Sequence, residues 1–196
     1  MMTGKRGGMS CSEPSAEALA FRRYLDRMAI RVDHALDKGL PRETVRPRVI
    51  HRAMRYTALS AGKRLRPALV ILSFESCGGT GRAIDQVAAT VEMVHAFSLI
   101  HDDLPAMDDD DYRRGKPSSH KVFGEGVAIL AGDALLTRAF QVLSRLRRAR
   151  SFGADTTAAL VEELSEATGS DGVIGGQVLD LLSEGKTVPR ATLTYI

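Results

Sequence analysis

The sequence predicts an all-α fold, an antiparallel bundle of helices. Apolar residues recur at three- and four-residue steps along most of the chain, and the alternation typical of strands is nearly absent. Glycine and proline punctuate the helical segments, without an internal repeat or a low-complexity linker between them. We therefore expect residues 1–196 to form a single domain, in which residues 1–14 are disordered.

The first half of the chain divides into four predicted helices. The first runs from about 15 to 38 and stops at Gly39; its apolar positions are Leu19, Phe21, Leu25, Met28, Val32 and Leu36. The second covers about 47–60. The third, 67–77, is almost wholly apolar, so we expect it to be buried. The fourth covers about 83–103 and ends before Pro105; one face carries Ile84, Val87, Val91 and Val94.

The second half begins with a polar loop through Gly126. Helices are predicted over about 127–150, 155–168 and 173–184, the last one ending before Gly185. Residues 189–193 have the pattern of one more helix start, and the chain ends at Ile196 without a polar tail. We therefore expect the chain to be incomplete at its C-terminus.

Composition excludes several classes of protein. With 44% apolar and 26% charged residues, the chain has the composition of a soluble globular domain. A net charge of +3, 5% aromatic residues and no Trp argue against nucleic-acid binding. Two cysteines, Cys11 and Cys77, form no CxxC pair, which suits a reducing compartment. We find no secretory leader or membrane span and expect a cytoplasmic protein.

The most informative segment is 101–115, which reads HDDLPAMDDDDYRRG. So many carboxylates repel one another unless hard cations bind them, and Mg²⁺ commonly shares carboxylates with substrate phosphates. His95 and Asp102 are two helical turns apart and face the same side. Pro105 interrupts the helix, so a bulged 104–107 segment would return Asp108 to the side of Asp102. A solvated acidic loop is the alternative, which the adjoining Arg113 and Arg114 disfavour.

Two further constellations carry polar residues at helical spacing. In the segment GKRLRP, at 62–67, Lys63 and Arg66 are three residues apart and would offer a point charge and a bidentate fork to a diphosphate. A solvent-exposed basic helix entry is an equal alternative. In GGQVLD, at 175–180, Gln177 and Asp180 stand on an otherwise apolar helix, and the glycines would permit close helix packing. Asp133, within an apolar segment, is expected to be buried and hydrogen-bonded.

These motifs together resemble the trans-polyprenyl diphosphate synthases, in particular the short-chain type that makes farnesyl or geranylgeranyl diphosphate. The matching segments are GKRLRP (62–67), HAFSLIHDDLPAMD (95–108), RRG (113–115), LAGDALL (130–136) and GGQVLD (175–180). The resemblance implies the isoprenoid synthase type of helix bundle, here truncated after the GGQVLD helix, and a homodimer.

The resemblance also implies a role for each motif. Asp102 and Asp108 would hold Mg²⁺ against an allylic diphosphate, with Asp103 assisting in catalysis. The substrate-binding residues would be Arg113 for the allylic diphosphate, then Lys63, Arg66, His95 and Arg114 for isopentenyl diphosphate, with Gln177 and Asp180 added from the GGQVLD helix. The substrates would be isopentenyl diphosphate and the dimethylallyl or geranyl diphosphates.

Phe97 gives a clue to product length. It lies five residues before Asp102, about one and a half turns below the metal site. In the family, an aromatic residue at this place resembles a floor that stops elongation at fifteen carbons, and Ser98 adds no second barrier. We therefore favour farnesyl over geranylgeranyl diphosphate; the alternative is that Phe97 only packs in the core.

One departure from the family pattern matters. The family carries a second aspartate-rich motif in a C-terminal segment, and this sequence ends before it. A non-catalytic subunit that pairs with an active synthase is therefore an alternative function. Terpene cyclases share a first aspartate motif but lack the basic site at Lys63 and Arg66, so they are disfavoured.

Overall fold

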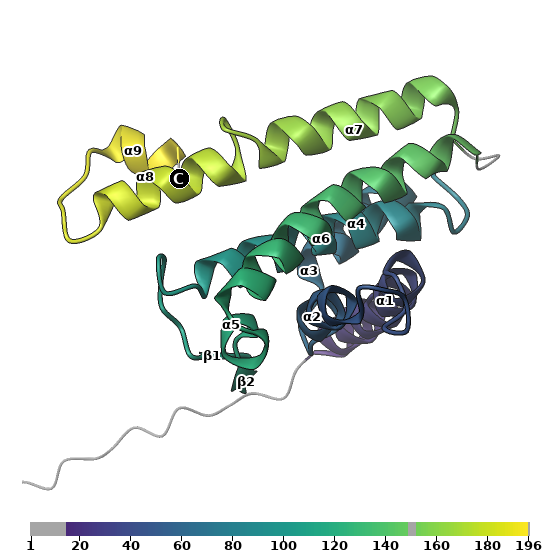
Figure 1. The fold of residues 1–196 in the computed structure, drawn as a ribbon. Coiled ribbons are helices and arrows are strands. Elements are labelled where there is room, and N and C mark those ends of the chain that lie inside the picture. Colours follow the sequence, from purple (N-terminus) through teal and green to yellow (C-terminus); the bar gives the residue numbers. More distant parts are fainter. Residues whose placement is uncertain (1–14, 149–151, 196) are drawn as a thin grey trace, which may run out of the picture.

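In a computed structural model, the structure describes residues 15–148 and 152–195, so the expectation for residues 1–14 lies outside it. The described chain is almost entirely helical (Figure 1). The elements are α1 (Ala16–Gly39), α2 (Arg48–Ala58), α3 (Leu65–Ser76), α4 (Ile84–Asp102), β1 (Tyr112–Arg113), β2 (Lys116–Pro117), α5 (Ser119–Phe123), α6 (Glu125–Arg145), a 3₁₀ turn (Leu146–Arg148), α7 (Ala154–Thr168), α8 (Val173–Ser183) and α9 (Arg190–Tyr195). The predicted all-α class is confirmed.

The helix boundaries follow local signals. The Ser15 hydroxyl accepts a hydrogen bond from the backbone N–H of Ala18 at 3.2 Å and caps α1, which ends at Gly39 as predicted. The helix predicted from about 189 is α9. The helix predicted over 127–150 starts earlier, at Glu125, and tightens into the 3₁₀ turn after Arg145.

Helix α4 is the centre of the bundle. It packs against α6, α3, α1 and α2, and it is buried on nearly every side. Small residues such as Ala88 and Ala89 let neighbouring helices approach closely, while Met93 and Ile100 fill the space between them. Figure 1 shows α7 and α8 along one side of the bundle and α1 and α2 along the other. This central position fixes the end of α4, where the acidic segment begins.

Helix α3 differs from its prediction. We expected it to be buried because it is almost wholly apolar, but only Pro67, Ala68 and Ile71 are buried, while Leu65 and Leu69 are exposed. When a helix is apolar on all sides, its sequence does not show which face packs against neighbouring helices. In the described chain, α3 packs with α4 and α1 only on one side.

The polar loop before residue 126 also contains structure that the sequence pattern did not predict. Strands β1 and β2 pair antiparallel, with Tyr112 opposite Pro117 and Arg113 opposite Lys116. Arg114 and Gly115 both have positive φ, 55° and 77°, the backbone of a two-residue type I′ turn. The Tyr56 hydroxyl donates to the Pro117 carbonyl at 2.7 Å and attaches the hairpin to α2.

The expectation that no segment approaches a membrane span needs correction. Residues Glu125–Arg148 are long and apolar enough to cross a membrane, judged by length and composition alone. The core helix of a soluble protein passes the same test. Here one face of α6 packs against α4 and buries Ala128, Ala131 and Leu135, whereas Ile129 and Leu130 are exposed.

Candidate functional site

The acidic segment folds back on the end of α4. After Asp102 the chain makes a tight turn, in which the backbone N–H of Asp108 donates to the Asp102 carbonyl at 2.9 Å. The N–H of Asp109 donates to the Leu104 carbonyl at 3.1 Å, and Asp109 has a φ of +53°. The turn therefore places Asp108 beside Asp102, as the interrupted helix predicted.

The closeness of these two carboxylates changes their electrostatics. Burial, followed by the negative charge of Asp108, raises the pKa of Asp102 to about 6. Two carboxylates held together in this way form an oxygen donor set that a hard dication would stabilise. The donor chemistry of Asp102 and Asp108 thus fits Mg²⁺.

Asp103 has a different environment from Asp102. It is buried, and Arg113 donates to its carboxylate through Nε at 2.7 Å and also through Nη2, which contacts Asp110 as well at 2.8 Å. Burial raises the pKa of Asp103, while the hydrogen bonds from Arg113 oppose that rise. Asp103 therefore orients Arg113 next to the acidic turn.

A second group of charged side chains surrounds His95, which lies on α4 two helical turns before Asp102. The Nη2 atom of Arg114 lies 3.3 Å from His95 Nε2, and its Nη1 donates to the Ala61 carbonyl at 3.2 Å. Burial, and then the positive charges of Arg66 and Arg114, lower the pKa of His95. The structure therefore brings three of the predicted diphosphate ligands, Arg66, His95 and Arg114, together.

Gly62 is needed for this arrangement. A Cβ atom there would lie 2.3 Å from Nη1 of Arg114, so the guanidinium would have to shift from its present position if residue 62 carried a side chain. The predicted pairing of Lys63 with Arg66 by helical spacing is wrong, because α3 begins only at Leu65 and Lys63 precedes it. Lys63 is exposed.

Sequence reasoning missed Arg64, which stands between these two cations. Its side chain is 2% exposed and pairs with the buried Glu92 at 2.5 Å and with Asp33 at 2.8 Å. Arg64 also adopts a left-handed backbone, with a φ of 49°. The signal was Glu92 itself, because a carboxylate inside an apolar helix requires a cationic partner.

An apolar pocket of about 360 Å³ opens beside Asp102. Its lining joins the C-terminal half of α4 and the turn after it to α6 and α8; the residues are Phe97, Ser98, His101, Asp102, Leu104, Ala106, Met107, Ile129, Val173, Ile174, Gln177, Val178 and Leu181. Phe97 is buried and packs edge-to-face on His101 with ring centres 4.9 Å apart. Of the polar residues predicted on α8, Gln177 lines this pocket, whereas Asp180 is exposed and does not.

Two observations differ from expectation. Asp133 is exposed rather than buried, and its carboxylate lies 3.8 Å from Nε2 of His101. In the part of the chain that the structure describes, the group with three possible metal-ligand atoms within 4.8 Å is Asp109, Asp111 and His120, not the predicted pair. Asp111, however, is already paired with Lys121 at 2.7 Å.

Comparison with known proteins supports one family. A family model described as polyprenyl synthetase matches residues 47–195. The chain is 46% identical over 192 residues to the heterodimeric geranylgeranyl pyrophosphate synthase large subunit 1, chloroplastic, of Arabidopsis thaliana, covering 98% of this chain and 51% of that protein. It is 42% identical to a farnesyl diphosphate synthase of Geobacillus stearothermophilus, covering 91% of this chain and 59% of that protein.

The fold comparison agrees. An FPP/GFPP synthase from Zymomonas mobilis superposes with a TM-score of 0.83 at 38% identity, over 90% of this chain and 64% of that chain. A geranyltransferase from Legionella pneumophila gives a TM-score of 0.82 at 38% identity, over 89% and 61%. The chain spans about half the length of the curated relatives it matches.

Proposed function

This chain belongs to the polyprenyl synthetase family, and from that premise we propose that the complete protein is a prenyltransferase. It condenses isopentenyl diphosphate with an allylic diphosphate to give a longer prenyl diphosphate. The observation that carries the proposal is the position of Asp102, which has the Asp108 carboxylate beside it and also lines the apolar pocket. A charged diphosphate and an apolar prenyl chain would be held on opposite sides of this one residue.

Each cluster has a distinct task in this reaction. Asp102 and Asp108 would hold Mg²⁺, which supplies charge neutralisation for the departing allylic diphosphate when bound. Arg113, held in place by Asp103, would contact the same diphosphate. Arg66, His95 and Arg114, with Lys63 beside them, would bind isopentenyl diphosphate and keep its double bond in reach of the allylic carbon.

The apolar pocket serves the carbocation stage. Its walls exclude water from the allylic centre after the C–O bond ionises, so the isopentenyl double bond becomes the available nucleophile. The condensed carbocation then loses a proton, which the departed diphosphate can accept, and the electrons of the broken C–H bond form the double bond of the product. A protein nucleophile is not required by this chemistry.

We propose farnesyl diphosphate as the product, because Phe97 is buried and lines the pocket below Asp102. An aromatic ring there limits the length of the prenyl chain that fits. Geranylgeranyl diphosphate is the alternative, since several relatives bear the name of geranylgeranyl synthases.

The test is prenyl transfer by the complete protein with isopentenyl, dimethylallyl and geranyl diphosphates in Mg²⁺. We expect product formation that Asp102→Asn lowers by about a hundredfold or more, because the metal loses a charged ligand. An Asp155→Asn variant serves as the matched control, since Asp155 is exposed on α7 and does not line the pocket. Full activity of Asp102→Asn would contradict the proposal.

A second candidate is a binding subunit that associates with an active synthase and does not turn over substrate itself. The apolar side chain of Leu182, which α8 exposes outside the pocket lining, would suit a partner surface. One relative is named as the large subunit of a heterodimeric synthase. Normal ligand binding without turnover, together with association with a second synthase chain, would favour this candidate. We also propose that the complete protein otherwise forms a homodimer.

A further inference from the structure

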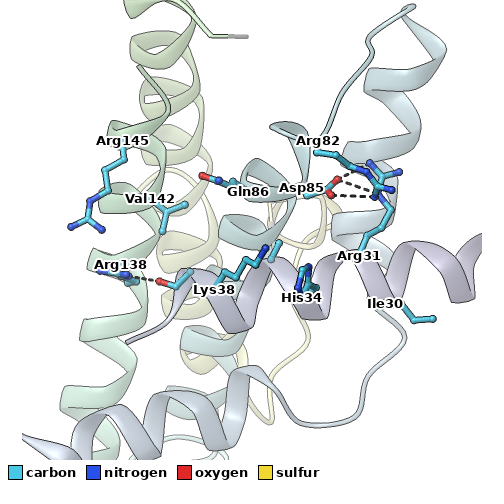
Figure 2. Close-up of a pocket in the computed structure, with 12 residues that line it drawn as sticks. Ile30, Arg31, His34, Lys38, Arg82, Asp85, Gln86, Arg138, Val142 and Arg145 are labelled. Carbon is cyan, nitrogen blue, oxygen red and sulfur yellow. Dashed lines mark hydrogen bonds and ion pairs between the residues drawn. The ribbon is translucent and has the colours of Figure 1, made fainter. Parts of the chain in front are cut away.

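A second pocket, of about 670 Å³, lies between the C-terminal half of α1, the start of α4 and the C-terminal half of α6 (Figure 2). It shares no lining residue with the apolar pocket at Asp102. It also lies at the opposite end of α4, near Asp85 rather than Asp102. A ligand bound here would therefore not occupy the proposed prenyl-transfer site.

The lining of this pocket is strongly basic. It contains Arg31, Lys38, Arg82, Arg138 and Arg145, against a single carboxylate, Asp85. Asp85 is already engaged: Arg31 donates to it through Nη2 at 2.6 Å and Nε at 3.1 Å, and Arg82 lies at 3.6 Å. Figure 2 shows this ion-pair group at one end of the pocket. The positive charge at the other end is not neutralised by it.

That other end is formed by Lys38, Arg138 and Arg145. Within residues 15–148 and 152–195, no carboxylate lies within 4.0 Å of any of these three cations. Arg138 is half-buried and held in place by neutral groups, since its Nε donates to the Gly39 carbonyl at 2.6 Å and its Nη1 donates to Gln141. Burial and the positive charge of Arg145 lower the pKa of Arg138. An anion would relieve this unfavourable concentration of charge.

We propose that this pocket binds an anion of the phosphate class with at least two negative charges, held by Lys38, Arg138 and Arg145. Arg145 can offer paired N–H donors to phosphate oxygens, Arg138 keeps its Nη2 for the anion, and the ammonium group of Lys38 adds a point charge. The volume exceeds that of inorganic phosphate, and Ala35 and Val142 add apolar surface to the lining, so a phosphate ester with a small apolar group also fits. The proposal does not depend on the prenyltransferase activity.

Binding is tested by isothermal titration calorimetry on the complete protein without Mg²⁺, using inorganic phosphate in one arm and butyl phosphate in the other. We expect both to bind, and at least tenfold weaker binding in Lys38→Gln/Arg145→Gln, whose two side chains are exposed and whose loss should leave the fold intact. Tighter binding of butyl phosphate assigns an organic phosphate to the pocket, whereas equal binding assigns the free anion.

Two variants of matched charge separate this pocket from other sites. Arg52→Gln removes one exposed positive charge from α2 and should leave phosphate binding unchanged. Arg66→Gln removes one from the proposed diphosphate site and should leave binding at this pocket unchanged, whatever it does at the diphosphate site. Gln86→Glu adds a carboxylate of nearly the same shape to the pocket lining and should weaken binding at least tenfold while raising the melting temperature.

Four results would overturn the proposal. The first is an absence of heat with either phosphate in the wild-type protein. The second is unchanged binding in both Lys38→Gln/Arg145→Gln and Gln86→Glu. The third is loss of binding in Arg66→Gln alone, which would move the anion to the substrate site. The fourth is that phosphate binding disappears when the protein dimerises, as measured by sedimentation, because the pocket would then be part of a protein interface.

Discussion

The backbone N–H of Asp108 donates a hydrogen bond to the carbonyl of Asp102 at 2.9 Å, although the two are six positions apart in the chain. A continuous helix would place these residues on different faces. The turn at Pro105 instead brings two carboxylates together at the edge of an apolar pocket. The properties of this pair lead to the first two predictions.

The first prediction concerns pH. The pKa of Asp102 is raised in the folded protein, to about 6, so the folded state binds more protons than the unfolded chain between about pH 4 and 6. Without metal, stability should therefore fall as pH rises through this window, by about 1 kcal/mol after allowance for solvent screening. Urea unfolding of wild type and Asp102→Asn at pH 4.5 and 7.5 checks this: the variant should lack this part of the fall.

The second prediction concerns metal and ligand binding. Mg²⁺ with an allylic bisphosphonate should stabilise the complete protein against heat, by about 2.7 kcal/mol at a ligand concentration of 100 times Kd. Asp102→Ala/Asp108→Ala should abolish this stabilisation, because both metal ligands are lost. Asp109→Ala/Asp111→Ala is the matched control, from the neighbouring acidic positions. Equal stabilisation of the wild type and the Asp102/Asp108 variant would show that the metal binds elsewhere.

The third prediction concerns the buried ion pair. Glu92→Leu leaves the Arg64 guanidinium buried without its nearest partner, so we expect a loss of about 3–5 kcal/mol in the free energy of unfolding. Asp33→Asn removes the other partner of Arg64, whose side chain is 53% exposed, and should cost less than about 1 kcal/mol. Chemical denaturation measures both. Similar costs for the two variants would contradict the view that the Glu92 contact determines the energy.

The fourth prediction concerns Gly62. In Gly62→Ala the new methyl group collides with Nη1 of Arg114, so the guanidinium must move away from His95. We expect the KM for isopentenyl diphosphate to rise about tenfold, with a smaller effect on the KM for the allylic substrate. Gly126→Ala is the control, because a Cβ there meets no atom within 4 Å. Steady-state kinetics would refute the idea if both KM values changed equally.

The fifth prediction concerns product length. Phe97→Ala should lengthen the chromatographically measured product and cost about 3–5 kcal/mol of stability. Phe123→Ala provides the comparison, since Phe123 packs on Tyr56 with ring centres 5.5 Å apart and does not line the pocket. It should lose stability without changing the product. If Phe97→Ala also leaves the product unchanged, Phe97 is a core residue only.

Much of the fold could be predicted because helices follow local rules. The periodicity of apolar residues, the cap at Ser15 and the stop at Gly39 depend on neighbours within a few residues. The β1–β2 hairpin escaped prediction because its strands have two residues each, too few for an alternation pattern. Arg114 and Gly115 form the hairpin turn, but the residues on either side show no apolar alternation, so the sequence did not indicate a hairpin.

The candidate site divides in the same way. The sequence alone determined which chemical groups are available and where they lie along the chain: the carboxylates at the end of α4 and after it, the cations around the start of α3 and the aromatic ring at Phe97. Only the tertiary structure decided that Arg64 is buried with Glu92, that Arg114 reaches His95, and that Asp133 faces solvent. These outcomes depend on contacts between segments distant in sequence, because burial and charge pairing are set by the neighbours that packing supplies, which no local pattern encodes.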